Sequence, residues 1–323
     1  GADIARNRMD AEAPLAAEAL AAVEASDIVV VAGCYDHVEQ VLGALEVPFQ
    51  IVQEGSLQHV TLRPDQILIV NCPGNMMPAE IVRVRDFVAA GGTLFTTDWA
   101  LGNVVEPAFP GHIAYNGEAT GDDVVRIDVL ETDSPYLQGV LDTGDDPQWW
   151  LEGSSHPIRV LDAERVRVLI RSAELGRKYG EDAVAVVFDY GKGEVFHMIS
   201  HYYLQRSELR NARHEQPAAS YLFEKGVNLR SELVGSIDDL ALGDVESAAT
   251  SARMMANIVA DKKRRSAARA VKLPKADLQQ KKLKWLPDIR ATEAGAYGAK
   301  SANLGEIAYA ALPGFEVPKG FAI

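Results

Sequence analysis

Cysteine is scarce in this sequence, and long hydrophobic runs are absent. The 323 residues include two cysteines, Cys34 and Cys72, which are too few for a disulfide framework or for a zinc site built from cysteines. No apolar stretch approaches the roughly 18 residues that a membrane helix needs. The N-terminus is rich in Ala and Glu and lacks the basic start and apolar centre of a signal peptide. We therefore expect a cytoplasmic protein that has no membrane partner.

Basic residues are outnumbered and unevenly distributed. The sequence holds 32 Lys and Arg against 46 Asp and Glu, a formal net charge of −14 at pH 7, so we expect no nucleic-acid partner. Residues 262–284 nevertheless contain ten basic residues against one acid, Asp277, a local charge of +9, and the rest of the chain carries −23. Such a charge boundary is typical of a linker or an exposed helix. With 47% hydrophobic residues, the chain can form a sizeable core.

Residues 27–97 alternate between strand-like and helix-like hydrophobic patterns. The pattern predicts four strands and two helices, the strands over 28–32, 48–52, 66–72 and 93–97 and the helices over 36–45 and 78–90. The second helix has Pro78 in its first turn and Gly91-Gly92 directly after it, which are common start and stop signals. Strands that alternate with helices form a parallel sheet covered on both faces. The predicted fold is an α/β domain with a doubly wound, mostly parallel, flavodoxin-like sheet.

Beyond residue 98 the pattern predicts a mixed-strand extension of this sheet. Residues 99–121 are rich in Gly, Pro and Asn and are expected to leave the sheet as an excursion. A hairpin turn at 190–193 joins the last two of four short strands, which are expected over 123–130, 166–171, 183–188 and 194–199. A helix over 217–225 is expected to close the domain.

A narrow helical stripe of apolar residues runs through 236–262. Its members repeat at spacings of four and three, at positions 241, 245, 248, 252, 255 and 259. We interpret the stripe as a surface that packs against the domain; a coiled coil or a homodimer interface is the alternative. The chain then divides into an N-terminal helical lead-in (1–26), the α/β domain (27–225), a helical arm with a basic linker (226–285) and a C-terminal segment (286–323).

Candidate site residues lie where the predicted strands end. Open α/β sheets bind ligands at the carboxyl ends of their strands, so we expect a small-molecule pocket there. Its candidate residues are Gly33, Cys72, Gly74, Asn75, Asp98, Trp99, His156 and His201. The aromatic pair Trp149-Trp150 either covers this pocket or belongs to the core.

Several of these residues have both a chemical and a structural interpretation. Asp98 is a candidate general base or ligand-binding carboxylate, but we favour a helix N-cap or a loop hydrogen bond. Cys72 is interpreted as a buried strand residue because no activating charge is evident beside it. His156, His197 and His201 are interpreted as packed or hydrogen-bonded, since no motif supplies the further ligands that a metal needs. We therefore expect no metal site.

The N-terminal region resembles a known superfamily. Residues 27–222 resemble the class I glutamine amidotransferase-like superfamily and, within it, the ThuA-like proteins. Four segments carry the resemblance: Pro73-Gly74-Asn75 after a strand, Ala89-Ala90-Gly91-Gly92 before the next strand, Ser155-His156-Pro157-Ile158, and the turn from Tyr190 to His197. The resemblance implies that fold. Because the turn after the strand 93–97 has neither the nucleophilic cysteine of the amidotransferases nor their glycines, it does not imply glutamine hydrolysis.

The C-terminal end resembles another family. Residues 297–307 and 317–323 resemble the opening of the nucleotide-binding, ATP-grasp domain of pyruvate phosphate dikinase and phosphoenolpyruvate synthase, although Ala299 replaces a glycine of that motif. The resemblance implies that Lys300 contacts ATP phosphate, that ATP and Mg²⁺ are cofactors of a longer parent, and that this chain is a fragment which binds neither. Our main expectation is a non-catalytic, ligand-binding or regulatory accessory domain fused to an ATP-dependent phosphotransferase.

Two alternatives remain beside this expectation. In the first, the α/β domain is itself a hydrolase-like or other enzyme that uses Asp98, His156 or His201, and these side chains then converge in one cleft. In the second, the domain is a structural dimerisation module built on the apolar stripe.

Overall fold

The computed structural model describes residues 1–203, 205–269, 277, 279, 282–311, 313–314 and 316–322. It separates into two compact units, unit 1 (Gly1–Ala267) and unit 2 (Ala268–Ile323). Residues 270–276, 278, 280 and 281 of the predicted basic linker, and Ile323 of the C-terminal motif, lie outside the described residues.

A mixed sheet forms the centre of unit 1, in the order β2-β1-β3-β4-β12-β11-β10-β7. The first five strands are parallel: β1 (Ile28–Val31), β2 (Gln50–Val52), β3 (Ile67–Val70), β4 (Thr93–Thr97) and β12 (Gly193–Met198). The others are antiparallel: β11 (Ala183–Tyr190), β10 (Val166–Arg171), β7 (Asp128–Val129), β9 (Ile158–Val160) on β11 and β5 (Ile113–Tyr115) on β9. The predicted α/β fold with a parallel-rich sheet is confirmed.

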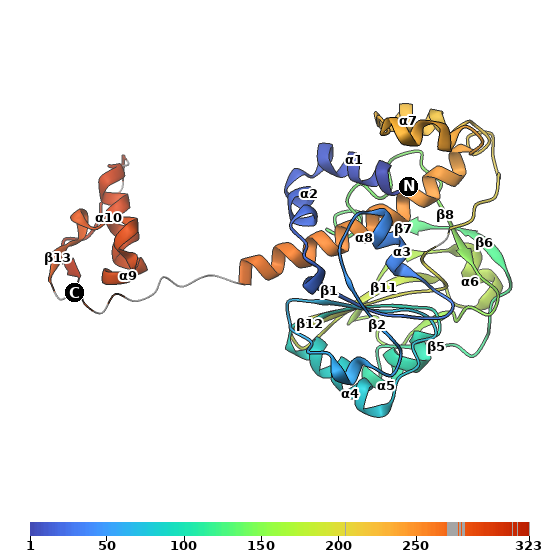
Figure 1. Ribbon diagram of the computed structural model, residues 1–323, viewed down its shortest axis with the longest axis horizontal. Helices are drawn as coiled ribbons and strands as arrows, with labels where there is room; N and C mark the ends of the chain where they lie inside the picture. Colours follow the sequence, from blue (N-terminus) through green and yellow to red (C-terminus); the bar gives the residue numbers. More distant parts are fainter. Residues whose placement is uncertain are drawn as a thin grey trace. The chain divides into compact units, whose positions relative to one another are not determined.

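Helices cover both faces of this sheet (Figure 1). On one side lie α4 (Pro78–Ala90) and the short α5 (Glu106–Ala108); on the other lie α1 (Ala2–Glu12), α3 (Val38–Ala44) and α8 (Leu242–Arg269). The remaining helices of unit 1 are α2 (Pro14–Ala21), α6 (Ala173–Tyr179) and α7 (Ala218–Lys225). All residues of β1 and β3 are buried, which explains why these strands are continuous β-branched and aliphatic runs.

Several elements differ from the sequence prediction. The strand expected over 123–130 is two strands, because β6 (Asp123–Arg126) pairs with β8 (Gln148–Leu151) in a separate sheet while β7 joins the main one. The excursion over 99–121 contains a π-helical turn (Leu101–Val105), α5 and β5. The strand β8 lacks the alternating pattern that identifies strands, and β9 alternates over only three residues, Ile158–Val160, which is too short to be identified.

Helix α8 packs within unit 1. Its residues Val245, Ala252, Met255 and Val259 are buried, so the apolar stripe contacts the chain's own core. Lys262, the first residue of the basic segment, is also buried, and its ammonium donates hydrogen bonds to the carbonyls of Pro64 (2.9 Å) and Gly91 (2.7 Å). The start of that segment is therefore part of a packed helix, and the expectation of a linker or an exposed helix is wrong for it.

A buried polar cluster occupies the amino end of the parallel strands. The carboxylate of Glu194, at the start of β12, accepts hydrogen bonds from the Thr93 hydroxyl (3.2 Å) and the Tyr136 hydroxyl (2.8 Å) and pairs with the Arg265 guanidinium. Arg265 also pairs with Asp261 at 2.6 Å. The two oxygens of Glu194 therefore have three donors, which satisfies this carboxylate. We call these five residues the amino-end cluster.

Unit 2 is small. It contains β13 (Lys284–Trp285), α9 (Ala294–Tyr297), α10 (Ala299–Ala310) and β14 (Phe321–Ala322), and its core is formed by Ile289, Tyr297, Ala302 and Ala322. Lys300 is exposed in the first turn of α10. A Cβ on Gly305 would lie 2.0 Å from the Ile289 carbonyl oxygen, so this motif glycine has a packing role.

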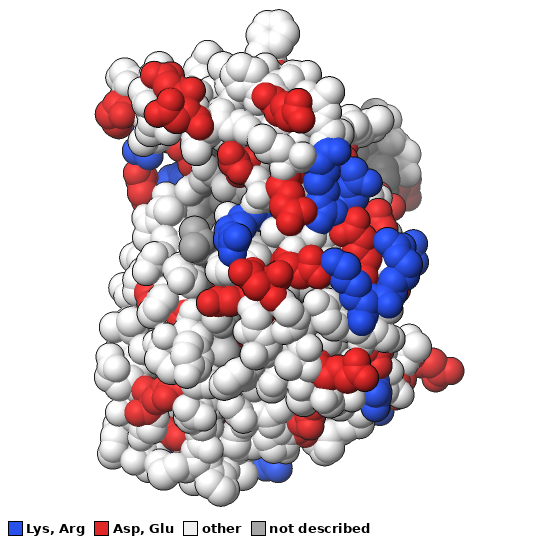
Figure 2. Space-filling model, turned by 90° about the vertical axis from the view of Figure 1, so that its right-hand side faces the viewer, with Lys and Arg blue, Asp and Glu red and all other residues white. Residues whose placement is uncertain are grey.

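On the face drawn in Figure 2, acidic and basic side chains are interspersed, and neither charge dominates. Ion pairs such as Lys178–Asp123 (2.6 Å) and Arg206–Asp122 (3.1 Å) join the two kinds of charge. Among the described residues, no helix has the length and apolar character needed to cross a membrane.

Candidate active site

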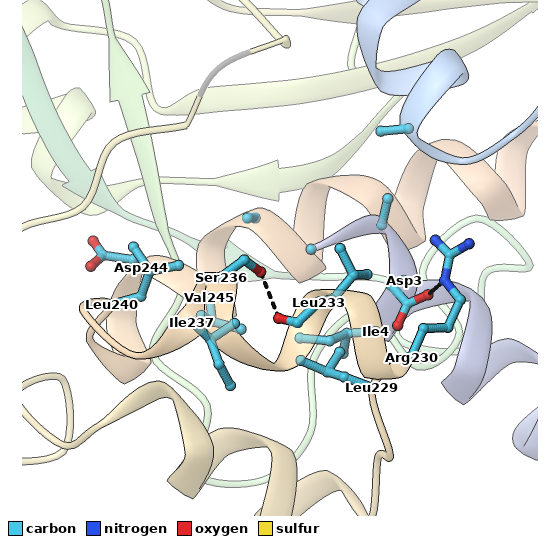
Figure 3. A pocket seen from close by; sticks show the side chains of 14 residues that line it. Asp3, Ile4, Leu229, Arg230, Leu233, Ser236, Ile237, Leu240, Asp244 and Val245 are labelled. Carbon is cyan, nitrogen blue, oxygen red and sulfur yellow. Dashed lines mark hydrogen bonds and ion pairs between the residues drawn. The ribbon is translucent and has the colours of Figure 1, made fainter.

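One cavity of unit 1, drawn in Figure 3, is mostly apolar. It measures about 340 Å³ and lies between α1, the 3-10 segment Ser231–Ile237 and α8. Leu229, Leu233 and Ile237 line it, and the ion pair Arg230–Asp3 (2.6 Å) lies at its side. Because no cluster of acid–base groups converges on it, this cavity offers no evident chemistry.

A smaller cavity of about 230 Å³ lies at the carboxyl end of the parallel strands. Its lining residues come from the ends of β1, β3, β4 and β12 and from the loop after β8: Tyr35, Cys72, Asp98, Trp99, Glu152, Gly153, Ser154 and His201. We call it the strand-end cavity. Its position is the one at which open α/β sheets bind ligands.

The order of the strands explains why three of these side chains meet. Strands β3, β4 and β12 are neighbours, and Cys72, Asp98 and His201 each follow the end of one of them. Asp98 has a left-handed backbone (φ 45°), as does Ser200 before His201 (φ 62°), a conformation that is uncommon for residues other than glycine. The backbone N–H of Asp98 donates to the Met198 carbonyl at 3.0 Å, which holds the ends of β4 and β12 together.

Asp98 is buried and hydrogen-bonded to the loop after β8. One carboxylate oxygen accepts from the backbone N–H of His156 at 2.9 Å, and the other lies 3.5 Å from the Ser155 hydroxyl. Burial raises the pKa of Asp98 to about 7, although the bond from His156 opposes this shift. The expected helix N-cap is wrong, since these partners belong to a loop, whereas the loop hydrogen bond expected as its alternative is present.

His201 connects two carboxylates. Its Nε2 lies 3.5 Å from Asp98 Oδ2, and its Nδ1 contacts the carboxylate of Glu152. In a neutral ring, a proton on Nδ1 would face Glu152 and leave the Nε2 lone pair toward Asp98. Behind this pair, the buried Asp36 accepts from the backbone N–H groups of Tyr202 (2.8 Å) and Tyr203 (3.1 Å) and so fixes the segment that carries His201.

Cys72 completes the floor of the strand-end cavity. Its Sγ lies 3.9 Å from Asp98 Oδ2, and burial raises the pKa of the thiol, with Asp98 adding to the effect. Gly33 packs directly behind it: a Cβ at this position would lie 2.1 Å from the Cys72 carbonyl oxygen. Gly33 thus allows the ends of β1 and β3 to approach closely.

Aromatic side chains form the wall. Tyr35, half exposed, contacts Trp99 edge to face at 5.5 Å, and the Trp99 indole N–H donates to the Ser154 carbonyl at 2.8 Å. The His156 ring is stacked between Trp99 (5.4 Å) and Tyr115 (3.8 Å), and burial lowers its pKa. His156 therefore supports the wall with its ring and the Asp98 carboxylate with its backbone.

The structure brings together four of the eight residues expected in the pocket. Cys72, Asp98, Trp99 and His201 line the strand-end cavity, and Gly33 and His156 lie behind its walls. Gly74 instead packs against Ala100 and Val104. Asn75 is exposed and binds Glu54 through its backbone N–H (3.2 Å) and its amide (3.4 Å).

Other residues weighed from the sequence belong to the core. His197 is buried in β12, where its Nδ1 lies 2.8 Å from the Thr96 hydroxyl, and burial lowers its pKa to about 3. Trp149 and Trp150 are buried on β8. Sequence reasoning missed Tyr35 and Glu152. Tyr35 could have been found because it follows the end of β1, but Glu152 follows a strand that was not predicted and has no local signal.

Comparisons with known proteins assign no family to this chain. No family model matches it, and no curated protein matches it. Similar solved structures include an exo-β-1,4-mannosidase from an Opitutaceae bacterium (TM-score 0.37, 11% identity, 54% of this chain and 31% of that one) and a carbohydrate deacetylase, Agd3 (0.40, 12%, 61% and 31%). A cytoplasmic protein from Salmonella typhimurium is similar with a TM-score of 0.40 and 10% identity, over 62% of this chain and 97% of that one.

This chain spans about a third of the length of the two enzymes, and at these scores none of the likenesses assigns an activity to it. They do correct the two sequence resemblances. The similar structures are glycosidases, a deacetylase and cytoplasmic proteins rather than ThuA-like amidotransferases or dikinase domains, so both resemblances are wrong. The expectation that this chain is an accessory domain of an ATP-dependent phosphotransferase, with a kinase and ATP-binding character, is therefore also wrong. The expected contact of Lys300 with ATP phosphate rested on the same resemblance.

The structure gives a physical reason for this error. Tyr190-Gly191-Lys192-Gly193 is the hairpin turn between β11 and β12, where Gly191 needs a positive φ (62°) and a Cβ on Gly193 would lie 2.1 Å from the Gly92 carbonyl oxygen. Gly92 itself faces the Phe87 ring. These glycines serve turn geometry and close packing, which unrelated α/β folds also require.

Proposed function

We propose that unit 1 is a hydrolase-like enzyme whose active site is the strand-end cavity. The observation that carries this proposal is the chain Glu152–His201–Asp98, in which one imidazole lies between two carboxylates beside an open cavity. A base oriented by a carboxylate is the arrangement that activates water or a hydroxyl group in many unrelated hydrolases.

Each group has a distinct role in the proposed reaction. Glu152 holds the His201 ring in the tautomer whose Nε2 is unprotonated. His201 Nε2 removes a proton from a water molecule as the water oxygen adds to an electrophilic carbon of the substrate, and the same proton then passes to the leaving group. Asp98, held by the backbone of His156, stabilises the imidazolium that forms between these two steps. The net change is addition of one water across the bond that breaks.

Tyr35 and Trp99 suit a small substrate with a flat or ring-shaped apolar face. Both are wall residues of the strand-end cavity, and Trp99 is fixed by its hydrogen bond to Ser154. A rigid aromatic surface beside charged groups binds such a substrate at low entropic cost.

The test is hydrolysis of a panel of p-nitrophenyl acyl esters and p-nitrophenyl glycosides by the full chain. We expect turnover of at least one class, and a loss of about 100-fold or more in kcat/KM in His201→Asn and in Asp98→Asn. The matched controls are His59→Asn and Asp65→Asn, which change exposed residues of the same types and should retain wild-type rates. No turnover on the whole panel, or equal losses in the controls, would refute the proposal.

Two further expectations belong with this proposal. The strand order β2-β1-β3-β4-β12, all parallel, supports the flavodoxin-like description, since it is the order 2-1-3-4-5 of that fold. The free thiols of Cys34 and Cys72 support a cytoplasmic location, because reducing compartments keep thiols unpaired.

A further inference from the structure

We propose that Cys72, Asp98 and His201 form the binding site of a single zinc ion. The inference concerns the same cavity as the proposed function and does not rest on that function for the binding of the ion. With zinc bound, His201 Nε2 would be a ligand and could not also act as the base, so the ion would supply the activation of water in its place.

Geometry is the first argument. The ligand atoms of the three residues, Cys72 Sγ, an Asp98 oxygen and a His201 ring nitrogen, all lie within 4.8 Å of one another. Asp98 Oδ2 lies 3.9 Å from the sulfur and 3.5 Å from Nε2. Around a tetrahedral zinc ion, ligand atoms are about 3.3–3.6 Å apart. Movements of about 1 Å or less would bring the three atoms to that spacing.

Electrostatics is the second argument. With Glu152 at Nδ1 of His201, the Nε2 nitrogen, the Asp98 carboxylate and the Cys72 sulfur face the same point, and the Cys72 thiol donates only a long contact of 3.9 Å to Asp98. All three groups are at least nine-tenths buried. Electron-pair donors that converge in a buried place repel one another unless a cation or a shared proton lies between them. A bound cation would satisfy all three at once.

The donor types select the metal. Thiolate and imidazole are typical ligands of zinc, whereas Mg²⁺ and Ca²⁺ prefer sites built from oxygen alone. Three protein ligands leave the fourth tetrahedral position free, and in catalytic zinc sites a water molecule occupies it. Here that position would face the strand-end cavity, where zinc would lower the pKa of the bound water.

The surrounding hydrogen bonds also suit a metal site. The contact of Glu152 with Nδ1 of His201 matches the carboxylate–histidine–metal arrangement that orients a ligating ring. Asp98 is likewise oriented by the backbone N–H of His156. Ligands whose orientation is fixed in advance bind a metal more tightly, so Glu152 acts as a positioning residue in this site.

The proposed site differs from the sequence expectation of no metal. Its ligands lie at positions 72, 98 and 201, each at the end of a different strand. Their spacing therefore matches no linear zinc motif, and only the adjacency of β3, β4 and β12 brings them together.

Titration of the metal-free full chain with Co²⁺, and with Zn²⁺ in competition, tests the inference. We expect one ion per chain, a Kd for zinc of about 1 µM or lower, and a thiolate-to-cobalt charge-transfer band in the near ultraviolet. Cys72→Ser should abolish the band, and Asp98→Asn and His201→Asn should weaken binding by about 100-fold or more. Glu152→Gln should keep the band and weaken binding by about 10- to 100-fold.

The matched control is Cys34→Ser, which removes the exposed thiol and should leave the band and the affinity unchanged. Absence of zinc binding at 100-fold above the expected Kd, a band that persists in Cys72→Ser, or a band lost in Cys34→Ser would overturn the inference. Circular dichroism of each variant verifies that it is folded.

Activity separates this inference from the proposed function. Zinc binding without hydrolysis of any substrate in the panel would support the site and refute the hydrolase. Hydrolysis that is unchanged by EDTA, in a chain that binds no zinc, would support the hydrolase and refute the site.

Discussion

The two ends of the parallel sheet in unit 1 hold buried carboxylates in opposite circumstances. At the amino end, Glu194 faces two hydroxyl groups and the Arg265 guanidinium, and its charge is compensated. At the carboxyl end, Asp98 accepts from the backbone N–H of His156 and from neutral Ser155 and Cys72 side chains, and among the described residues no Lys or Arg is paired to it. A compensated buried group stabilises the fold, whereas an uncompensated one is retained at a cost in stability, which is typical of functional sites.

Breaking the amino-end cluster should have the largest effect on stability. Glu194→Gln leaves the Arg265 guanidinium without its closest carboxylate, and we expect unfolding to become easier by about 3 kcal/mol, with the kcat/KM of the folded protein unchanged. Urea unfolding at pH 7.5 measures the difference. Glu131→Gln, which breaks the surface pair with Arg167 (3.1 Å), should cost less than about 1 kcal/mol. Equal losses in the free energy of unfolding for the two variants would show that the amino-end cluster stabilises the fold no more than a surface ion pair does.

Between the two ends, His197 should make the sheet sensitive to acid. Burial depresses the pKa of His197 to about 3 in the folded state, against about 6.5 when unfolded. The contribution of the neutral ring to the free energy of unfolding is therefore complete above pH 6.5 and is lost as the pH falls toward 3. At pH 5 the loss is about 2 kcal/mol. The free energy of unfolding at pH 7.5 and 5.0 should therefore fall further in the wild type than in His197→Asn.

A suitable control for that measurement is His59→Asn, because His59 is exposed. This variant should show the same acid sensitivity as the wild type. If His197→Asn shows the same acid sensitivity as the wild type, burial does not keep His197 neutral at pH 5. The buried strand β12 would then tolerate a charged imidazole between the two ends of the sheet.

The smallest effect is expected at the wall of the strand-end cavity. Tyr35→Leu should raise KM by about five-fold, equivalent to about 1 kcal/mol of lost aromatic contact. It should leave kcat nearly unchanged, because the Tyr35 ring only stacks beside the His201 ring, with centroids 6.5 Å apart. Since Tyr35 is half exposed, the free energy of unfolding should change by about 0.5 kcal/mol or less. Tyr309→Leu changes an exposed tyrosine of unit 2 and should leave KM unchanged. A fall in kcat without a change in KM would place Tyr35 in the chemistry instead.

The parallel half of the sheet could be predicted from the sequence because its strands are short apolar runs between clear turn signals. The helix over 78–90 and the strand over 93–97 agree with α4 and β4 residue for residue. The antiparallel half was harder to predict. A strand such as β8, with the buried run Gln148–Leu151, lacks the alternation that would mark it, because it is covered on both faces.

The candidate site could be located but not assembled from the sequence. The rule that ligands bind at strand ends identified Cys72, Asp98 and Trp99, which line the cavity. It also included Asn75, which turns outward to Glu54, since the direction of a side chain beyond a strand end depends on the turn. The role of Glu152 depends on a contact with His201, which lies 49 residues later in the sequence, and no local pattern records such a contact.

Helix α8 also determines how unit 1 can be produced for experiments. Its residues Met254, Met255, Ile258 and Val259 are each 1% exposed and belong to the same core as the sheet. A recombinant chain that stopped at Lys225 would leave this area of the sheet in contact with water, and exposed apolar surface of that kind leads to aggregation. A chain extended to Ala267 keeps the helix and the two hydrogen bonds of Lys262. The shortest expression product worth purifying therefore ends at Ala267, which lies 69 residues after Met198, the last residue of β12.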